Sequence, residues 1–239
     1  MNKIQQLQKI IDESQRIVFF TGAGVSVDSG IPDFRSQDGL YHLNYDVSPE
    51  TILSHSYFEK HPEEFYRFYR DKMIYPEVKP NITHDFIAKI EKKGKSLGVI
   101  TQNIDGLHQA AGSKRVVELH GSVLRNTCMR CHKHYDLNKI INTVSIPRCT
   151  CGGIIKPDVV LYEEALDETS LDTALSWIQR ADCLMIFGTS LSVYPAAGLV
   201  RYFHGKHLVV INKSSTYIDQ NADLCFNEGL SNVLSQIRL

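Results

Sequence analysis

Short, continuously apolar runs recur along this chain with helical segments between them, and this alternation restricts the fold more than any other feature. The runs lie at 17–20, 97–101, 116–119, 183–187 and 208–211. Runs without polar alternation are typical of strands covered on both faces. Helical periodicity lies at about 84–93, 171–180, 195–204 and 230–237, and residues 1–16 predict an amphipathic helix. The pattern predicts an α/β fold with a doubly wound, largely parallel sheet.

Composition excludes several broad classes of protein. The chain has 239 residues, of which 43% are hydrophobic, and a net charge of −1. That is enough apolar material for a packed core, and no basic face indicates a nucleic-acid or membrane partner. No apolar run reaches the length of a membrane span, and the N-terminal segment does not resemble a signal peptide. We therefore expect a cytoplasmic protein, and a monomer, because no long exposed apolar stripe is evident.

The first apolar run ends in a glycine turn, Gly22-Ala23-Gly24. Glycine lets the backbone approach a pyrophosphate closely, and a following helix start offers free N–H groups to phosphate oxygens. The dinucleotide fingerprint G-x-G-x-x-G would need glycine where this chain has Val27. A bare G-x-G is also common as a plain connection between a strand and a helix. By itself, the turn indicates only a candidate phosphate site.

Four of the six cysteines are clustered. Cys128, Cys131, Cys149 and Cys151 form a C-x2-C pair and a C-x-C pair separated by 17 residues. Four thiolates suit a tetrahedral zinc ion and leave no open position for catalysis, which predicts a structural zinc site. Because the second pair is unusually short, His132 or His134 is an alternative fourth ligand. A nucleic-acid-binding zinc ribbon is the rival interpretation, and the near-neutral charge disfavours it.

Polar residues also follow the other apolar runs. They are Gln102, Asn103 and Asp105 after the second run, His120 after the third, Thr189 and Ser190 after the fourth, and Asn212 and Lys213 after the fifth. Each group alone is compatible with an ordinary helix cap, turn or hydrogen-bonded histidine. Together they would place phosphate- and ribose-binding groups along one edge of the sheet, where open α/β sheets bind ligands. A neutral His120 could accept a proton near pH 7.

An ordered set of motifs resembles the sirtuin family over nearly the whole chain. The set is GAGVS at 22–26, GIPDFR at 30–35, TQNID at 101–105, His120-Gly121, the paired cysteines, KPDVVLYEE at 156–164, GTSL at 188–191 and INK at 211–213. The resemblance implies a Rossmann-like NAD-binding domain and a smaller zinc-ribbon and helical domain built from two insertions. The expected large domain comprises 1–40, 82–126 and 157–239, and the small one 41–81 and 127–156.

The resemblance also implies the activity. It is that of an NAD-dependent protein-lysine deacetylase, which transfers the acyl group from lysine to ADP-ribose and releases nicotinamide and 2′-O-acetyl-ADP-ribose. NAD would be the co-substrate, one zinc ion would be structural, and acyl-lysine proteins would be the partners. His120 would be the general base, Asn103 would position ribose or water, and Asp105 with the Ile104 backbone would hold the nicotinamide carboxamide. The remaining NAD-binding residues would be Gly22, Ala23, Gly24, Phe34, Arg35, Gln102, Gly188, Thr189, Ser190, Asn212, Lys213 and Glu228, with Phe34 covering the reacting ribose.

The peptide substrate would add as a strand along 159–163, through Val159, Val160, Leu161 and Tyr162, with Val193 opposite. An ordinary strand is the plain alternative. Members that prefer acidic acyl groups carry a Tyr-x-x-Arg pair, whereas here Arg70 comes one position late after Tyr66. A helical step of about 100° turns that guanidinium away, which favours acetyl or other uncharged acyl groups. Glu163 replaces a glycine that is common in the family, a change that bears on how the peptide docks.

Two other functions compete with deacetylation. Mono-ADP-ribosyl transfer to protein occurs in branches of this family, and the presence of His120 argues against it. An NAD-sensing or zinc-mediated interaction module would need no general base. The combination of Asn103, Asp105 and His120 therefore favours an enzyme.

Overall fold

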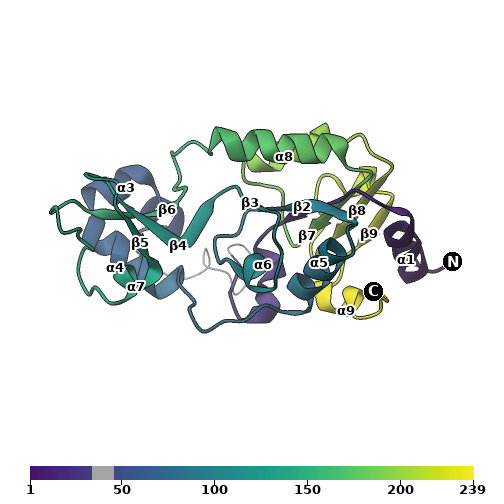
Figure 1. The fold of residues 1–239 in the computed structure, drawn as a ribbon, viewed down its shortest axis with the longest axis horizontal. Coiled ribbons are helices and arrows are strands. Elements are labelled where there is room, and N and C mark those ends of the chain that lie inside the picture. The colour runs from purple at the N-terminus through teal and green to yellow at the C-terminus, as the bar shows by residue number, and fades with distance from the viewer. Residues whose placement is uncertain (34–45) are drawn as a thin grey trace.

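The fold comprises a six-stranded sheet flanked by helices and a smaller lobe with its own three-stranded sheet (Figure 1). It is seen in a computed structural model that describes residues 1–33 and 46–239. Phe34 and Arg35, both expected to contact NAD, lie outside the described residues.

The large sheet is parallel throughout and has the strand order β3-β2-β1-β7-β8-β9. Its strands are β1 Ile17–Thr21, β2 Ser96–Thr101, β3 Val116–Glu118, β7 Cys183–Phe187, β8 His207–Ile211 and β9 Leu224–Phe226. All five expected apolar runs form strands, and β9 adds a sixth that the sequence did not predict. After β1 the chain builds one side of the sheet with β2 and β3. It then builds the other side of β1 with β7, β8 and β9. The switch point of the sheet therefore lies between β1 and β7, where doubly wound sheets bind ligands.

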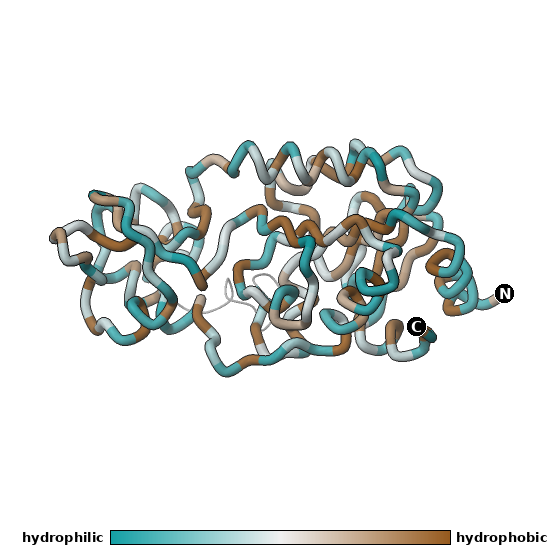
Figure 2. The backbone as a smooth tube through the Cα atoms, viewed as in Figure 1, coloured by the Kyte–Doolittle hydropathy of each residue, from teal (hydrophilic) through white to brown (hydrophobic). Residues whose placement is uncertain are grey.

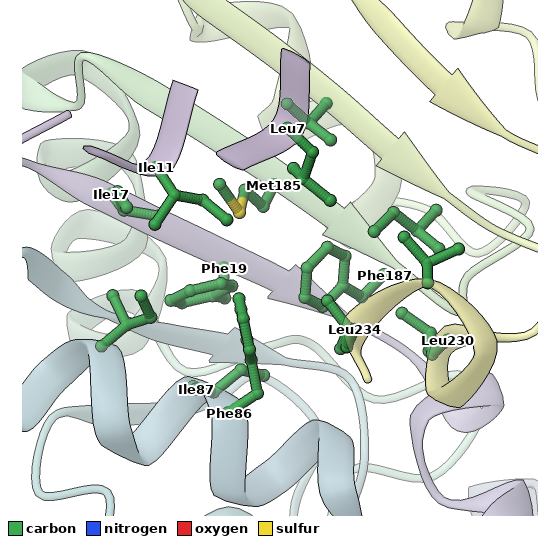
Figure 3. Close-up of a cluster of buried hydrophobic side chains, with 14 of the residues drawn as sticks. Leu7, Ile11, Ile17, Phe19, Phe86, Ile87, Met185, Phe187, Leu230 and Leu234 are labelled. Carbon is green, nitrogen blue, oxygen red and sulfur yellow. The ribbon is translucent and has the colours of Figure 1, made fainter. Parts of the chain in front are cut away.

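Helices cover both faces of this sheet. On one face lie α1 Lys3–Glu13, α5 Ile82–Lys92 and α9 Leu230–Leu234, and on the other lie α8 Glu168–Arg180 and the 3-10 helix η4 Ala196–Tyr202. The expected helix at 195–204 is thus a 3-10 helix. In the core shown in Figure 3, the Phe19 ring lies 6.4 Å from Phe86 and 5.6 Å from Phe187 between ring centroids. Apolar residues follow the strands in Figure 2, and the outer helix faces are more hydrophilic.

Local signals explain where several helices begin. Asn2 caps α1 and Asn81 caps α5, each in a reciprocal capping box with the third helical residue, and Asp167 caps α8. These side chains satisfy backbone N–H groups that a helix start leaves unpaired. The remaining short elements beside the large sheet are η1 Ala23–Val25, η2 Val27–Ser29, α6 Leu107–Ala110 and η5 Asp219–Asn221.

The smaller lobe combines an antiparallel sheet with short helices. Its elements are β4 Gly121–Cys128, β5 His134–Asp136, β6 Ile155–Val159, α2 Pro49–Ile52, α3 His55–Lys60, α4 Pro62–Lys72 and α7 Leu137–Ile141. Residues from 52–74 and 123–161 share one buried apolar cluster, in which Phe58, Phe65 and Tyr66 make edge-on ring contacts. Strands β4 and β6 cross the expected domain boundaries at 126 and 157, so the division into two domains stays a prediction. Among the described residues, no helix is long and apolar enough to cross a membrane.

Candidate active site

The turns that follow β1 and β7 touch each other at the switch point. The Gly24 amide donates to the Gly188 carbonyl at 2.8 Å, and the Gly22 amide to the Phe187 carbonyl at 3.1 Å. A Cβ on Gly24 would lie 2.7 Å from Gly188 Cα, which no relaxed structure allows. Gly188 itself has φ +57°, in the left-handed region that favours glycine. Packing of one turn on the other is therefore a sufficient reason for these glycines, whatever ligand they also approach.

A polar network connects the glycine turn to the end of β2. The Ser26 hydroxyl donates to Asp105 Oδ2 at 2.7 Å, and Asn103 Nδ2 donates to Ser26 Oγ at 3.1 Å. Asp105 Oδ1 accepts from the Leu107 amide at 2.9 Å, and the Asn103 amide donates to Thr101 Oγ1 at 3.0 Å. Ser26 thus joins two residues that we predicted to be catalytic. Ser26 was not among the predicted site residues, although its hydroxyl within the GAGVS motif was a usable signal.

His120 follows β3 and is held in a defined orientation. Its Nδ1 lies 2.9 Å from the Gln102 carbonyl oxygen, which can only accept, so Nδ1 carries the proton. In a neutral ring, Nε2 then keeps its lone pair. Burial lowers the pKa of His120, and the hydrogen bond to Gln102 acts in the opposite direction. The imidazole is therefore neutral at neutral pH and can accept a proton at Nε2.

Gln102 extends this arrangement across the switch point, because its side-chain amide donates to Thr189 Oγ1 at 2.9 Å. Farther along the same edge, Asn212 Nδ2 donates to the Ser214 carbonyl at 2.7 Å, and the Asn212 amide donates to the Phe226 carbonyl at 3.1 Å. Exposed polar residues complete the edge at Ser190, Lys213 and Glu228. Ala23 and Ile104 are half-buried within the turns. The predicted NAD-binding residues within the described chain thus lie at the carboxyl ends of neighbouring strands.

The expected peptide-binding segment is only partly available to a further strand. The Val160 amide donates to the His120 carbonyl at 2.9 Å, which connects the segment to the candidate base. The Tyr162 amide donates to Leu53, and the Tyr162 carbonyl accepts from the His55 amide, so both backbone groups are used by the turn between α2 and α3. The Leu161 amide is also used, because it donates to Glu164 Oε2 at 2.8 Å, whereas the Tyr162 side chain is 37% exposed. Val193 lies half-buried ahead of η4.

The four clustered cysteines form a candidate metal centre in the smaller lobe. Their sulfur atoms all lie within 4.8 Å of one another, and the Cys128–Cys151 and Cys131–Cys149 pairs are each 3.5 Å apart. Tetrahedral zinc with sulfur ligands at about 2.3 Å needs sulfur atoms roughly 3.8 Å apart, so these residues are positioned to bind a zinc ion. The C-x-C pair closes the site without a histidine. His134, one alternative ligand, is 3.0 Å from Thr127 Oγ1 instead.

Hydrogen bonds from neighbouring residues to the cysteine sulfur atoms support this centre. The Tyr135 hydroxyl donates to Cys149 Sγ at 3.0 Å, and the Arg130 amide donates to Cys128 Sγ at 3.4 Å. Hydrogen bonds of this kind orient thiolate ligands and stabilise their charge. With sulfur at all four positions, no coordination site is open for a catalytic water.

Arg70 is engaged within the smaller lobe. Its guanidinium donates to the carbonyls of Val144 and Ser145 at 2.7 and 3.1 Å and lies over the Tyr66 ring, 5.7 Å from its centroid. Tyr66 is fully buried, and its hydroxyl donates to the Ile155 carbonyl. Both groups of the shifted Tyr-x-x-Arg pattern therefore have partners in the protein.

A parallel sheet in this order, with polar groups at its switch point, defines a dinucleotide-binding class of fold. The Sir2 family model matches residues 22–195, and the chain belongs to this family. A Clostridium perfringens protein named NAD-dependent protein deacetylase is 57% identical over 240 residues, covering 99% of this chain and 98% of the relative. A Staphylococcus aureus protein of the same name is 48% identical over 239 residues, covering 99% and 98%.

Solved structures agree with this assignment. A Sir2 protein with a p53 peptide and NAD⁺ has a TM-score of 0.88 and 39% identity, covering 98% of this chain and 97% of the other. A Sir2 complex with an inhibitor, 2′-O-acetyl-ADP-ribose and deacetylated p53 peptide has a TM-score of 0.86 and 38% identity, covering 97% and 96%.

Proposed function

We propose that this protein is an NAD-dependent protein-lysine deacetylase, with His120 as its general base. The observation that carries the proposal is the orientation of His120. Its Nδ1–H is committed to the Gln102 carbonyl at 2.9 Å, and burial keeps the ring neutral. Nε2 is then ready to take a proton from a ribose hydroxyl, which allows the acyl group to pass from lysine to ADP-ribose. One water molecule is consumed, and the products are the free lysine, nicotinamide and 2′-O-acetyl-ADP-ribose.

The residues at the carboxyl edge of the sheet fit NAD through their chemistry. Amide, hydroxyl and cationic groups there suit ribose and phosphate. NAD supplies the ADP-ribose acceptor and the nicotinamide leaving group. Asp105, held by Ser26 and the Leu107 amide, would bind the carboxamide together with the Ile104 backbone, and Asn103 would orient ribose or water. Phe34 and Arg35 remain part of this proposal, although they lie outside the described residues.

The substrate we infer is a protein lysine carrying an uncharged acyl group. Arg70 makes two hydrogen bonds to loop carbonyls, so its charge is committed to the smaller lobe rather than to an acidic acyl chain. Val159–Leu161 would pair with the peptide backbone, with Val193 opposite. The bond from the Val160 amide to the His120 carbonyl would hold this strand against the base.

Nicotinamide release from NAD, measured with and without peptide, tests the proposal. We expect release only with an acetyl-lysine peptide, accompanied by 2′-O-acetyl-ADP-ribose, and at least about tenfold slower release with a succinyl-lysine peptide. Stable ADP-ribose labelling of the acceptor protein would favour mono-ADP-ribosyl transfer. Equal rates with the two acyl groups would contradict the assignment of acyl class.

His120→Ala tests the general base. We expect the deacetylation rate to fall by about 10²-fold or more, because base catalysis contributes on that order. The Kd for NAD should stay within about twofold, because the imidazole acts on the proton rather than on cofactor affinity. Undiminished turnover would refute the assignment. His204→Ala, an exposed histidine after η4, is the matched control and should retain full activity.

A further inference from the structure

Two buried histidines pack against each other behind the glycine loop, which we define as residues 22–29. His84 on α5 and His108 on α6 are 0% and 1% exposed, and their ring centroids are 4.9 Å apart. Each ring has one buried nitrogen without a hydrogen-bond partner among the described residues, Nε2 of His84 and Nδ1 of His108. A buried, unpaired polar atom is costly, so two of them on adjacent rings point to a small bound group that contacts both.

The hydrogen bonds of the outer nitrogens determine what the inner ones offer. The Asn81 amide donates to His84 Nδ1 at 3.2 Å, so the proton of the neutral ring is on Nε2. His108 Nε2 lies 3.0 Å from Thr21 Oγ1. Burial lowers the pKa of both histidines, that of His108 to about 3, so both rings are neutral. His84 Nε2–H is therefore a buried donor without a partner in the described part of the chain, on a ring that packs against His108.

The same two histidines contact groups at both ends of the glycine loop. Thr21, the partner of His108, is the last residue of β1 and directly precedes Gly22. Asn81, the partner of His84, donates from its side chain to the Val25 carbonyl at 2.8 Å and to Ser29 Oγ at 2.9 Å. Between these anchors lies Ser26, which donates to Asp105. A shift of either imidazole would therefore be transmitted to the loop whose Ser26 holds Asp105, the candidate nicotinamide-binding residue.

We propose that His84 and His108 are positioning residues for the glycine loop, joined by one buried water molecule. The water accepts from His84 Nε2–H and donates to His108 Nδ1, which makes His108 Nε2–H the donor to Thr21 Oγ1. Both orphan nitrogens are then satisfied, as is usual for polar sites that hold internal water. The positioning role rests on the proposed NAD site, whereas the water-bridged pair does not.

Nitrogen NMR of ¹⁵N-histidine-labelled protein tests the pair without any measurement of activity. We expect both rings to stay neutral from about pH 5.5 to 8, and both to carry the proton on Nε2. A His108 ring protonated on Nδ1, or titration of either ring within that range, would overturn the water bridge. Because this experiment uses the unaltered chain, its result does not depend on whether a variant folds.

Two conservative variants test the positioning role. His84→Asn keeps an acceptor near the Asn81 amide and removes the inward donor, and His108→Gln keeps a donor for Thr21 and removes the inward acceptor. We expect each to raise the Kd and KM for NAD by about tenfold, the size expected for one unsatisfied buried hydrogen bond. The KM for the acetyl-lysine peptide should change by less than about twofold. A loss of folded protein would lower the apparent kcat and leave both KM values unchanged, so a rise in the KM for NAD separates the two explanations.

His207→Asn is the matched control, because His207 also has a buried Nε2 without a partner but begins β8 at the opposite end of the sheet. It should leave the Kd for NAD unchanged even if its melting temperature falls. Unchanged NAD affinity in His84→Asn and His108→Gln, or an equal loss in His207→Asn, would refute the positioning role. Failure of the unaltered protein to bind NAD would refute the proposed function instead, and the NMR result would still decide on the bridged pair.

Discussion

At the scale of single residues, Glu163 shows how a side chain offsets local backbone strain. It is not glycine, yet its φ is +76°. Its carboxylate accepts from the Ser56 amide at 2.9 Å and from the Ser56 hydroxyl at 3.0 Å, at the start of α3. A left-handed conformation costs a residue with a Cβ about 1–2 kcal/mol. The contacts with Ser56 compensate for that cost and hold the segment after Tyr162 in place.

Comparison of Glu163→Gly with Glu163→Ala isolates the strain. Both variants lose the contacts with Ser56, but only glycine relieves the backbone conformation. We expect Glu163→Gly to have a free energy of unfolding about 1 kcal/mol greater than that of Glu163→Ala, measured by urea denaturation. Equal stability, or greater stability of the alanine variant, would show that the left-handed conformation carries no cost at this position.

The active-site residues could be predicted to very different extents. Each polar residue at a strand end was identifiable because the preceding apolar run predicts where the strand stops. The hydroxyl of Ser26 is visible in the GAGVS motif, but its role was not identified, because its partners Asn103 and Asp105 lie about eighty positions away in the chain. A hydrogen bond between such distant residues leaves no local pattern.

At the scale of elements, the packing of α8 on β2 requires glycine at position 98. The register between β1 and β2 shifts between Ile17 and Val18, which pair with Ser96 and Gly98. Gly98 has φ +153°, and a Cβ there would lie 2.3 Å from the Trp177 ring and 2.7 Å from the Arg115 carbonyl oxygen. The indole of α8 occupies the space that any larger residue would need.

Gly98→Ala should therefore be strongly destabilising. We expect a loss of about 3 kcal/mol or more in the free energy of unfolding, because a clash with backbone cannot be relieved by a side-chain rotation. Gly94→Ala is the control, since Gly94 has φ +74° with nothing near its Cβ position, and should cost only about 1 kcal/mol. Similar losses in the two variants would contradict the packing explanation.

The types of the main elements were predicted better than the shortest strand and the exact helix geometry. The apolar runs became strands because helices cover both faces of the sheet. Strand β9, three residues long, and the 3-10 geometry of η4 were not predicted, because neither has a distinct period in the sequence. In the same way, the pairing of Tyr162 with the turn between α2 and α3 depends on a contact between distant segments.

At the scale of the whole molecule, the cysteine centre lies in a lobe whose core comes from two separate segments. Cys128 and Cys149 belong to the same buried cluster as Phe58 and Tyr66. A zinc ion there would connect the end of β4 to the 149–151 turn and close that cluster. Metal binding and folding of the smaller lobe should therefore be coupled.

Metal analysis with a chelation series tests this coupling. We expect about one zinc per chain, and a fall in melting temperature of about 5 °C or more when the metal is removed, because structural zinc contributes several kcal/mol. Cys151→Ser should lose the zinc, whereas Cys225→Ser, outside the cluster, should retain it. Full zinc content in Cys151→Ser, or an unchanged melting temperature after chelation, would contradict a structural role.

Local sequence patterns predict the alternation of five of the sheet strands with the main helices, the polar groups at the strand ends and the cysteine cluster. These follow from local patterns, because apolar period, glycine turns and ligand spacing act over a few residues. Tertiary packing alone brings Ser26 between Asn103 and Asp105, orients His120 through Gln102, and places the His84 ring against that of His108. Those contacts arise where strands and helices distant in the chain meet at one edge of the sheet, and their hydrogen bonds depend on three-dimensional distance rather than on sequence separation.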